Sequence, residues 1–210
     1  AYVGYLYTIY PKDYMIDFNV NFVGMDNHIS NQQSLLNFSW GSIAPQQERG
    51  FLNENRYSSI SYKYPGDDGI DDLGMSEGSK NKTVKSNLQW IAFKQQFFSV
   101  ILLANDNYFM NSELAFDTFA PEDKNLKQFS AQANVMYSRN KTDYGFRFYF
   151  GPNKSNQLKT YDKGMERLIN LGWPIVRHVN KWIVLPVFNW LSKNLSSMGL
   201  IILLLTIMIK

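Results

Sequence analysis

The stretch YMIDFNVNF, residues 14–22, decides the fold class, because apolar and polar side chains alternate along it with a period of two. This pattern is typical of a β-strand that buries one face. The same alternation recurs in residues 36–40, 60–64, 129–137 and 146–150. Repeated strands of this kind predict a mainly β protein built from antiparallel sheets.

The composition and two further segments extend this prediction. Aromatic residues make up 16% of the 210 residues, and they favour pleated, half-buried strands. Residues 96–103, QFFSVILL, are apolar apart from one serine, which indicates a central strand covered on both faces. Residues 65–85 are rich in Gly, Asp and Ser, and we expect a mobile surface loop there.

Charge and cysteine content exclude several classes of function. The chain has 21 basic and 18 acidic residues, a balance that gives no support to a nucleic-acid partner. The lack of cysteine excludes disulfides, thiolate metal sites and a cysteine nucleophile. Asp67, Asp68, Asp71 and Asp72 lack the spacing of a calcium-binding loop, so we predict a solvated loop with no metal or cofactor.

The character of the chain changes after Gly151-Pro152, which we expect to end the last strand. Residues 153–172 carry apolar side chains at helical spacing and are interpreted as a helical connector. Residues 173–194 are predicted to form an amphipathic helix, which Pro186 would kink or divide.

The amphipathic helix has the side chains of a membrane-interface segment. Tryptophans and lysines of this kind are common in the headgroup layer of a bilayer. The residues concerned are Trp173, Trp182, Trp190, Lys181 and Lys193. An alternative interpretation is a helix that packs onto the core of the β-domain.

The last apolar run, residues 198–209, reads MGLIILLLTIMI and follows a polar break suited to cap a helix. It is shorter than the roughly 20 residues that a bilayer span requires. We therefore expect residues 197–210 to be the first half of a transmembrane helix, in a fragment cut at both ends.

Lys210 would lie about 18 Å along that helix, slightly past the middle of the hydrocarbon layer. A lysine at this depth is costly and usually faces a bundle interior or a hydrated cavity with a function. Two other readings remain open: Lys210 snorkels at the end of a short span, or the run is a buried helix of a soluble domain.

Four short motifs occur in a recognisable order: WIAFKQQFF at 90–98, YFGP at 149–152, LGWP at 171–174 and GLIILLLTIMIK at 199–210. Together they resemble the YidC-type membrane protein insertases, at the junction of the periplasmic domain and the membrane core. Asn153 departs from the family pattern, because it separates Gly151-Pro152 from Lys154.

The resemblance implies an antiparallel β-supersandwich over residues 1–152, truncated at its N-terminus, in the periplasm beside a bacterial inner membrane. It implies insertion and folding of nascent membrane proteins, alone or with the Sec translocon, with the lipid bilayer as a further partner. No enzymatic chemistry or catalytic residue is implied. The position matched by Lys210 supplies the cation of a hydrophilic groove in the family, and Thr206 is a candidate groove-lining residue.

Two other functions compete with this one. A carbohydrate-binding or mutarotase-like β-sandwich, anchored to the membrane, would share the architecture. Acid–base chemistry of that kind would need His28, because His178 falls on the polar side of the amphipathic helix. We expect His28 to be exposed in a hairpin turn instead. A membrane-anchored scaffold without insertase activity is the third possibility.

Overall fold

The computed structural model describes residues 1–74, 76–105, 107–169, 180–195 and 197–209. It divides into a β-rich unit, Ala1–Leu168, and a helical unit, Ile169–Lys210.

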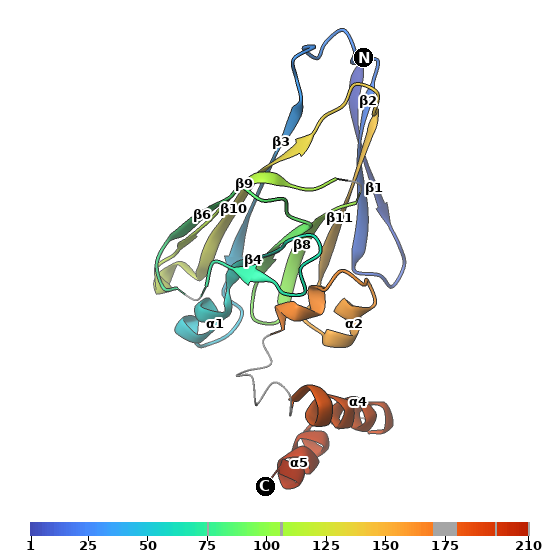
Figure 1. The fold of residues 1–210 in the computed structure, drawn as a ribbon. Coiled ribbons are helices and arrows are strands. Elements are labelled where there is room, and N and C mark those ends of the chain that lie inside the picture. The colour runs from blue at the N-terminus through green and yellow to red at the C-terminus, as the bar shows by residue number, and fades with distance from the viewer. Residues whose placement is uncertain (75, 106, 170–179, 196, 210) are drawn as a thin grey trace. The chain divides into compact units, whose positions relative to one another are not determined.

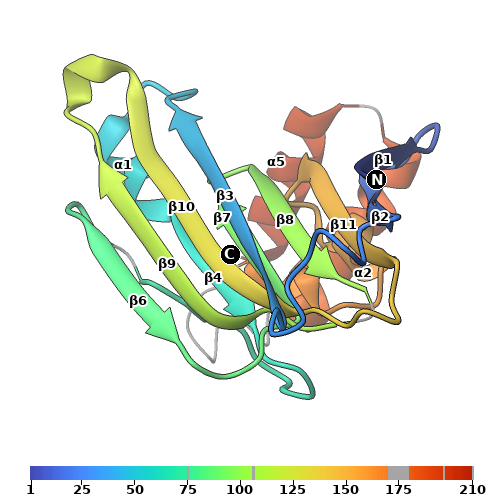
Figure 2. The same ribbon diagram turned by 90° about the horizontal axis from the view of Figure 1, so that it is seen from above.

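Two antiparallel sheets form the β-rich unit (Figures 1 and 2), which confirms the predicted mainly β fold class. The larger sheet has the strand order β1 (Tyr2–Ile9), β2 (Met15–Val23), β11 (Asp143–Pro152), β8 (Phe98–Ala104), β7 (Trp90–Lys94), β4 (Ser59–Lys63) and β5 (Asp71–Asp72). The smaller sheet has the order β3 (Leu35–Pro45), β10 (Asn125–Met136), β9 (Met110–Thr118) and β6 (Lys80–Val84).

Alternation along the strands places one set of side chains between the sheets. In β10, Phe129, Ala131 and Ala133 are buried, whereas the intervening Ser130 and Gln132 are exposed. The register of the larger sheet continues this pattern from strand to strand, because residues directly opposite each other share a face. Thus Tyr7 of β1, Phe18 of β2 and Phe146 of β11 lie side by side on the inner face.

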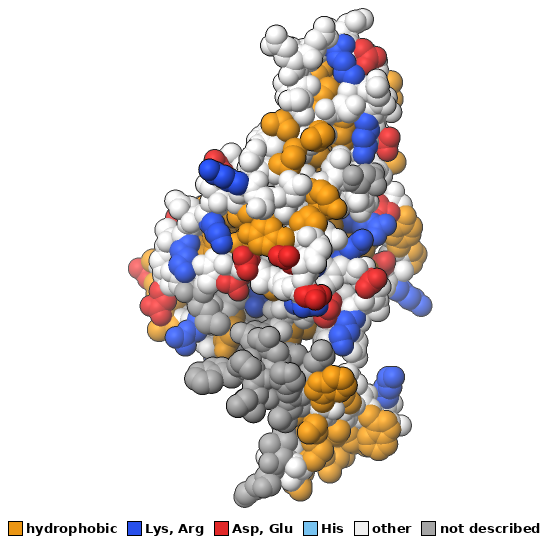
Figure 3. Space-filling view, in the orientation of Figure 1, with side chains coloured by type: hydrophobic (Ala, Val, Ile, Leu, Met, Phe, Trp, Pro, Cys, Tyr) orange, Lys and Arg blue, Asp and Glu red, His pale blue; other side chains and the backbone are white. Residues whose placement is uncertain are grey.

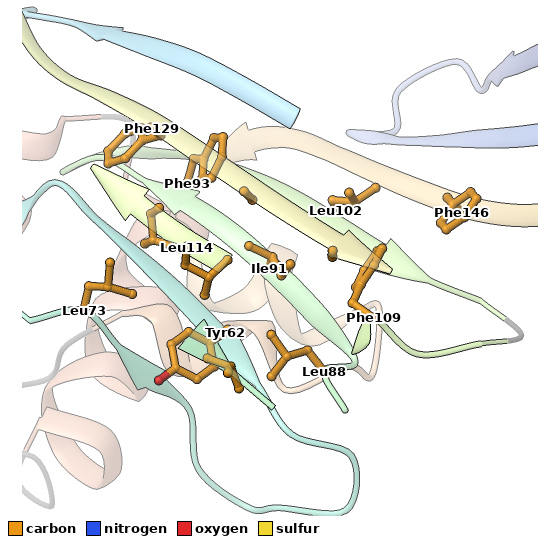
Figure 4. Packing of buried hydrophobic residues seen from close by; sticks show 14 of the residues in the cluster. Tyr62, Leu73, Leu88, Ile91, Phe93, Leu102, Phe109, Leu114, Phe129 and Phe146 are labelled. Carbon is orange, nitrogen blue, oxygen red and sulfur yellow. The ribbon is translucent and has the colours of Figure 1, made fainter. Parts of the chain in front are cut away.

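The core between the sheets combines aromatic and aliphatic side chains (Figure 4). The Trp40 ring of β3 stacks on Phe93 of β7 with ring centroids 3.7 Å apart. Phe93 also stacks on Phe129 of β10, at a centroid distance of 5.1 Å. These contacts join the two sheets through rings that bury large apolar areas, so the alternating strands have a common core.

Strand β8 is central, as predicted, since β11 and β7 flank it and Ile101, Leu102 and Leu103 are all buried. Residues 153–168, which contain α2 (Ser155–Lys159) and η2 (Met165–Leu168), contact the sheet at Trp90 of β7, which lies opposite Leu103 of β8. The Trp90 indole N–H donates to the Lys163 carbonyl oxygen at 2.9 Å, and this bond fixes the covering segment on the sheet.

The prediction of a mobile loop over residues 65–85 is wrong for two parts of that segment. β5 pairs with β4, and β6 pairs with β9 at the edge of the smaller sheet. Four of the five β6 residues are exposed, and only Val84 is buried. An exposed edge strand with charged side chains has no apolar alternation, so the pattern of β6 resembles that of a loop.

Two short helices complete the β-rich unit. α1 (Phe51–Tyr57) follows β3, and η1 (Pro121–Asp123) precedes β10. The buried Glu54 carboxylate accepts hydrogen bonds from the backbone N–H groups of Gln47 and Glu48, at 3.0 and 2.9 Å. These bonds hold the chain entering α1, because they satisfy a buried charge with fixed donors.

Glycine is required at position 151, because the side chains of Tyr149 and Tyr14 approach its backbone closely. A Cβ at this position would lie 2.6 Å from the Tyr149 ring and hydroxyl and 2.9 Å from Tyr14 Cγ. The Tyr149 ring is fully buried and its hydroxyl donates to the Pro152 carbonyl oxygen at 2.7 Å, so it has little room to move.

We therefore expect Gly151→Ala to lower the free energy of unfolding by about 1–3 kcal/mol through overpacking. Gly69→Ala is the matched control, because its Cβ would meet nothing within 4 Å. Denaturant titration followed by circular dichroism measures both changes. Equal stability of the two variants would contradict the steric role of Gly151.

The helical unit contains a π-helical turn, η3 (Asn180–Val184), followed by α4 (Leu185–Asn194) and α5 (Met198–Ile209). Pro186 lies in the first turn of α4, where its missing N–H costs nothing. Val184, directly before α4, has right-handed helical dihedrals, so the π-helical turn continues into α4 without a break. The kink or division expected at Pro186 stays a prediction. The N–H of Leu200 donates to the Ser197 hydroxyl at 3.5 Å, which caps α5 at the predicted polar break.

Within the described part of the chain, no helix has both the length and the apolar character needed to span a membrane.

Candidate functional site

Helix α5 is apolar on almost every side. Ile201 and Leu205 are buried against α4, where Leu191 is their buried partner. Among the side chains of α5 that the structure describes, the remaining large apolar ones are exposed: Met198, Leu200, Ile202, Leu203, Leu204, Ile207 and Met208. Figure 3 shows the described surface of this unit as mostly hydrophobic. A helix that is hydrophobic all round is typical of a membrane span or a protein core.

Thr206 is the one hydroxyl-bearing residue within α5. It is exposed, and its hydroxyl donates to the Ile202 carbonyl oxygen at 2.8 Å, so its proton is satisfied inside the helix. The Thr206 oxygen keeps acceptor capacity toward its surroundings. Lys210, the predicted groove cation, lies outside the described residues, and its role stays a prediction.

Helix α4 presents two different faces. Leu191 is buried against α5, whereas the neighbouring Trp190 is 65% exposed. Trp182, in the preceding π-helical turn, is 70% exposed. Lys193 is also exposed, one turn after Trp190. This arrangement suits a helix lying in a headgroup layer, where tryptophan rings and lysine ammonium groups both find partners.

Trp173 and the side chain of Lys181 lie outside the described part of the structure, as does His178. The role of the five interface residues therefore stays a prediction. His28 is exposed in a turn, where its backbone N–H donates to the Met25 carbonyl oxygen at 2.8 Å. The exposed turn predicted for His28 is confirmed, but the predicted hairpin is wrong, because this segment connects β2 of the larger sheet to β3 of the smaller sheet.

The described residues contain no group of three or more His, Cys, Asp or Glu side chains that could hold a metal ion. Asp68, from the predicted acidic loop, lies 3.5 Å from the Arg167 guanidinium across an exposed ion pair. Such a pair contributes little to stability, because solvent screens it.

Sequence reasoning missed the function of Asn153, which holds the turn between β7 and β8. Its amide N–H groups donate to the carbonyl oxygens of Gln95 and Gln96, at 2.9 and 3.3 Å. Its amide oxygen accepts the Ser99 hydroxyl at 2.7 Å. The signal was present in the sequence, since Asn153 is the residue that separates Gly151-Pro152 from Lys154.

Comparisons with known proteins agree on one family. The model of the YidC periplasmic domain family matches residues 2–189. The membrane protein insertase YidC of Bacteroides fragilis is 37% identical over 217 residues, covering 100% of this chain and 35% of that protein. The proteins of the same name from Parabacteroides distasonis and Porphyromonas gingivalis are 34% and 35% identical over 220 and 219 residues. They too match the whole chain, over 34% and 35% of their own lengths.

The chain thus spans about a third of the length of the curated relatives it matches. The family match covers the β-rich unit and the first half of α4. It favours the insertase family over the carbohydrate-binding alternative. The resemblance predicted from the four sequence motifs is confirmed, and the chain belongs to the YidC periplasmic domain family.

Proposed function

We propose that this chain is part of a membrane protein insertase, to which it contributes a β-rich domain and the start of the membrane core. The observation that carries the proposal is α5, whose exposed side chains are apolar except for Thr206. Such a surface is unfavourable in water and favourable in hydrocarbon. The relatives named as insertases support the same function.

In this proposal, successive parts of the chain lie in the periplasm, in the lipid headgroup layer and in the membrane. Residues 1–152 form a domain in the periplasm of a bacterium, and residues 153–172 connect it to the membrane. Residues 173–194 lie in the headgroup layer, as the exposed Trp182 and Trp190 favour. Residues 197–210 form the first half of a span in the inner membrane.

Lys210 acts in this proposal as the cation of a hydrated groove. A lysine in the middle of a bilayer costs roughly 2.5–3.5 kcal/mol, so water or a polar recess must surround it. Thr206 precedes it by four residues, a spacing that puts both on one face of a helix. A positive charge in a low-dielectric recess attracts carboxylates strongly, which favours entry of hydrophilic parts of a nascent membrane protein.

The proposed partners follow from this role. Nascent membrane proteins are the substrates, the lipid bilayer surrounds α5, and the Sec translocon is a partner that delivers some of the substrates. The proposed action is binding and transfer of a polypeptide without covalent chemistry, so no catalytic residue is assigned.

An insertion assay with the complete protein in vesicles tests the proposal. We expect Lys210→Ala to lower the yield of inserted substrate severalfold, whereas Lys210→Arg keeps the charge and most of the activity. Lys85→Ala is the matched control, because Lys85 is exposed on the β-rich unit. Equal yields from all four forms would contradict the groove role of Lys210.

A further inference from the structure

One end of the β-rich unit gathers three segments that are far apart in the sequence (Figure 1). The turn between β1 and β2 contacts the segment after α2, because the Tyr161 hydroxyl donates to the Asp13 carboxylate at 2.5 Å. The turn between β7 and β8 contacts the residue that precedes α2, because the Asn153 N–H donates to the Phe97 carbonyl oxygen at 2.7 Å. These bonds make the end a defined surface.

This aromatic end, as we name it, exposes several large rings. Phe97 is 53% exposed, Phe98 is 57% exposed and Phe150 is 48% exposed. Tyr10 and Tyr14, from the neighbouring turn, are 47% and 42% exposed. Single exposed apolar side chains are common on proteins, but a group of large rings at one end marks an interaction site.

The exposed rings are held by ordered structure. Phe98 is the first residue of β8, and it lies opposite Pro152 of β11. Asn153 fixes the turn that carries Phe97 with its backbone and amide hydrogen bonds. The Phe150 ring stacks on Phe148 at a centroid distance of 5.6 Å. The rings therefore lose little further conformational entropy when a partner binds them.

The charge of the aromatic end is positive. Residues 9–14, 94–98 and 152–162, which build it, contain four basic and two acidic side chains. Lys12, Lys154 and Lys159 are exposed. One of the acidic groups, Asp13, accepts the Tyr161 hydroxyl. Exposed phenyl rings beside lysines fit a surface with an apolar interior and a negative outer layer, which is the make-up of an anionic bilayer.

The path of the chain agrees with this partner. The β-rich unit ends at Leu168, the last residue of η2, fourteen residues after the exposed Lys154 of the aromatic end. The next unit contains α5, with its exposed apolar side chains. A domain followed within a few dozen residues by a membrane helix stays near the bilayer surface, so even a weak contact is favoured by a high effective concentration.

We propose that the aromatic end of the β-rich unit docks on the membrane, with Phe97, Phe98 and Phe150 inserted into the headgroup layer of anionic lipids. This inference rests on the proposed membrane placement of α5, and it adds a second, peripheral contact made by the periplasmic domain. The contact would hold the domain in one orientation over the insertion site.

Lipid quenching of single fluorescent labels tests the proposal in the complete protein, reconstituted into vesicles that contain anionic and brominated lipids. This chain has no cysteine, so cysteines introduced here provide defined labelling positions once any cysteines elsewhere in the complete protein are replaced. Phe97→Cys reports the aromatic end. Met136→Cys is the matched control, because Met136 is 59% exposed at the opposite end of the strands. Ile207→Cys, 66% exposed on α5, reports the membrane segment.

We expect brominated lipid to quench the labels at 97 and 207 severalfold more strongly than the label at 136. Quenching at 207 without quenching at 97 would overturn the docking inference and leave the proposed function standing. Lack of quenching at 207 would overturn both. A blue-shifted label at 97 that brominated lipid does not quench would mean that a protein covers this end, which also overturns the inference.

The charge contribution is tested with the same labels. Replacing anionic by zwitterionic lipid should weaken quenching at 97 severalfold and leave quenching at 207 unchanged. The double variant Lys154→Glu/Lys159→Glu should have the same effect in anionic vesicles. Unchanged quenching at 97 in both experiments would show that the lysines do not direct the contact and would overturn the assignment to anionic lipid.

Discussion

Trp90→Ala is expected to lower the free energy of unfolding of the β-rich unit by about 3–5 kcal/mol, because it empties a large buried volume. Trp90 is fully buried on the outer face of β7. Its indole N–H also donates to the Lys163 carbonyl oxygen, so the variant loses a hydrogen bond between the sheet and the segment that covers it. Guanidinium titration followed by the strand signal in circular dichroism measures the change.

Two further variants separate the causes. Trp90→Phe keeps most of the ring volume but lacks the donor, so we expect an intermediate loss of about 1–3 kcal/mol from the unpaired Lys163 carbonyl oxygen. Trp190→Ala is the matched control for tryptophan removal, since Trp190 is 65% exposed on α4. If Trp90→Ala and Trp190→Ala unfold at the same denaturant concentration, Trp90 does not secure the covering segment.

The strands that sequence reasoning found are those with one buried face. β2, β10 and β11 alternate because their inner residues, such as Phe18, Phe129 and Phe146, pack between the sheets. Burial of one face stabilises such a strand, and it also requires an apolar residue at every second position of the sequence. Prediction succeeds here because the pattern and the physical cause coincide.

The strands that sequence reasoning missed are stabilised differently. β6 is held by backbone pairing with β9, while its side chains from Lys80 to Thr83 are exposed. Backbone hydrogen bonds do not depend on side-chain type, so they leave no periodic signal. The partner that makes β6 a strand lies some thirty residues further along the chain, and only the fold brings the two together.

The candidate site was predictable in part for a similar reason. The apolar run identified α5 from the sequence alone, whereas the interface role assigned from the tryptophans stays a prediction. The aromatic end was missed, because Phe97 and Phe98 open an apolar run that indicates a buried strand. Their exposure depends on where β7 ends, at Lys94, and on the turn that Asn153 holds. Neither feature is visible in the run itself.

A second large effect is expected from Lys127→Met, which should lower the free energy of unfolding by about 2–4 kcal/mol near neutral pH. Lys127 is fully buried, and its ammonium group donates to the backbone carbonyl oxygens of Asn55, Ser58 and Ser76 at 3.1, 2.6 and 3.1 Å. Asn55 and Ser58 lie at the end of α1, where a cation is favoured.

The methionine side chain fills the space of Lys127 but donates no hydrogen bond. The three backbone carbonyl groups remain in the variant. The variant therefore leaves buried acceptors unpaired, which costs more than the relief of desolvation returns. Lys85→Met is the matched control, because Lys85 is exposed. A Lys127→Met protein as stable as the Lys85→Met protein would show that the carbonyl cage does not stabilise the fold.

The pH dependence of this difference gives an independent test of the same group. Burial lowers the pKa of Lys127 from its ordinary 10.5 to about 8, and the nearby charge of Lys80 acts in the same direction. Between these two pKa values the unfolded chain binds more protons than the folded chain, so stability contributed by this group rises with pH and is lost as pH falls.

The unfolding free energy of the unmodified protein should therefore rise relative to that of Lys127→Met between pH 8 and pH 10, by on the order of 2 kcal/mol. Burial raises the pKa of the Tyr144 and Tyr149 hydroxyls, which lowers stability above about pH 10 in both proteins and cancels in the comparison. Denaturant titrations at pH 7, 8, 9 and 10 measure the difference. A difference that stays constant from pH 7 to pH 10 would mean that the pKa of Lys127 is not lower in the folded protein than in the unfolded chain.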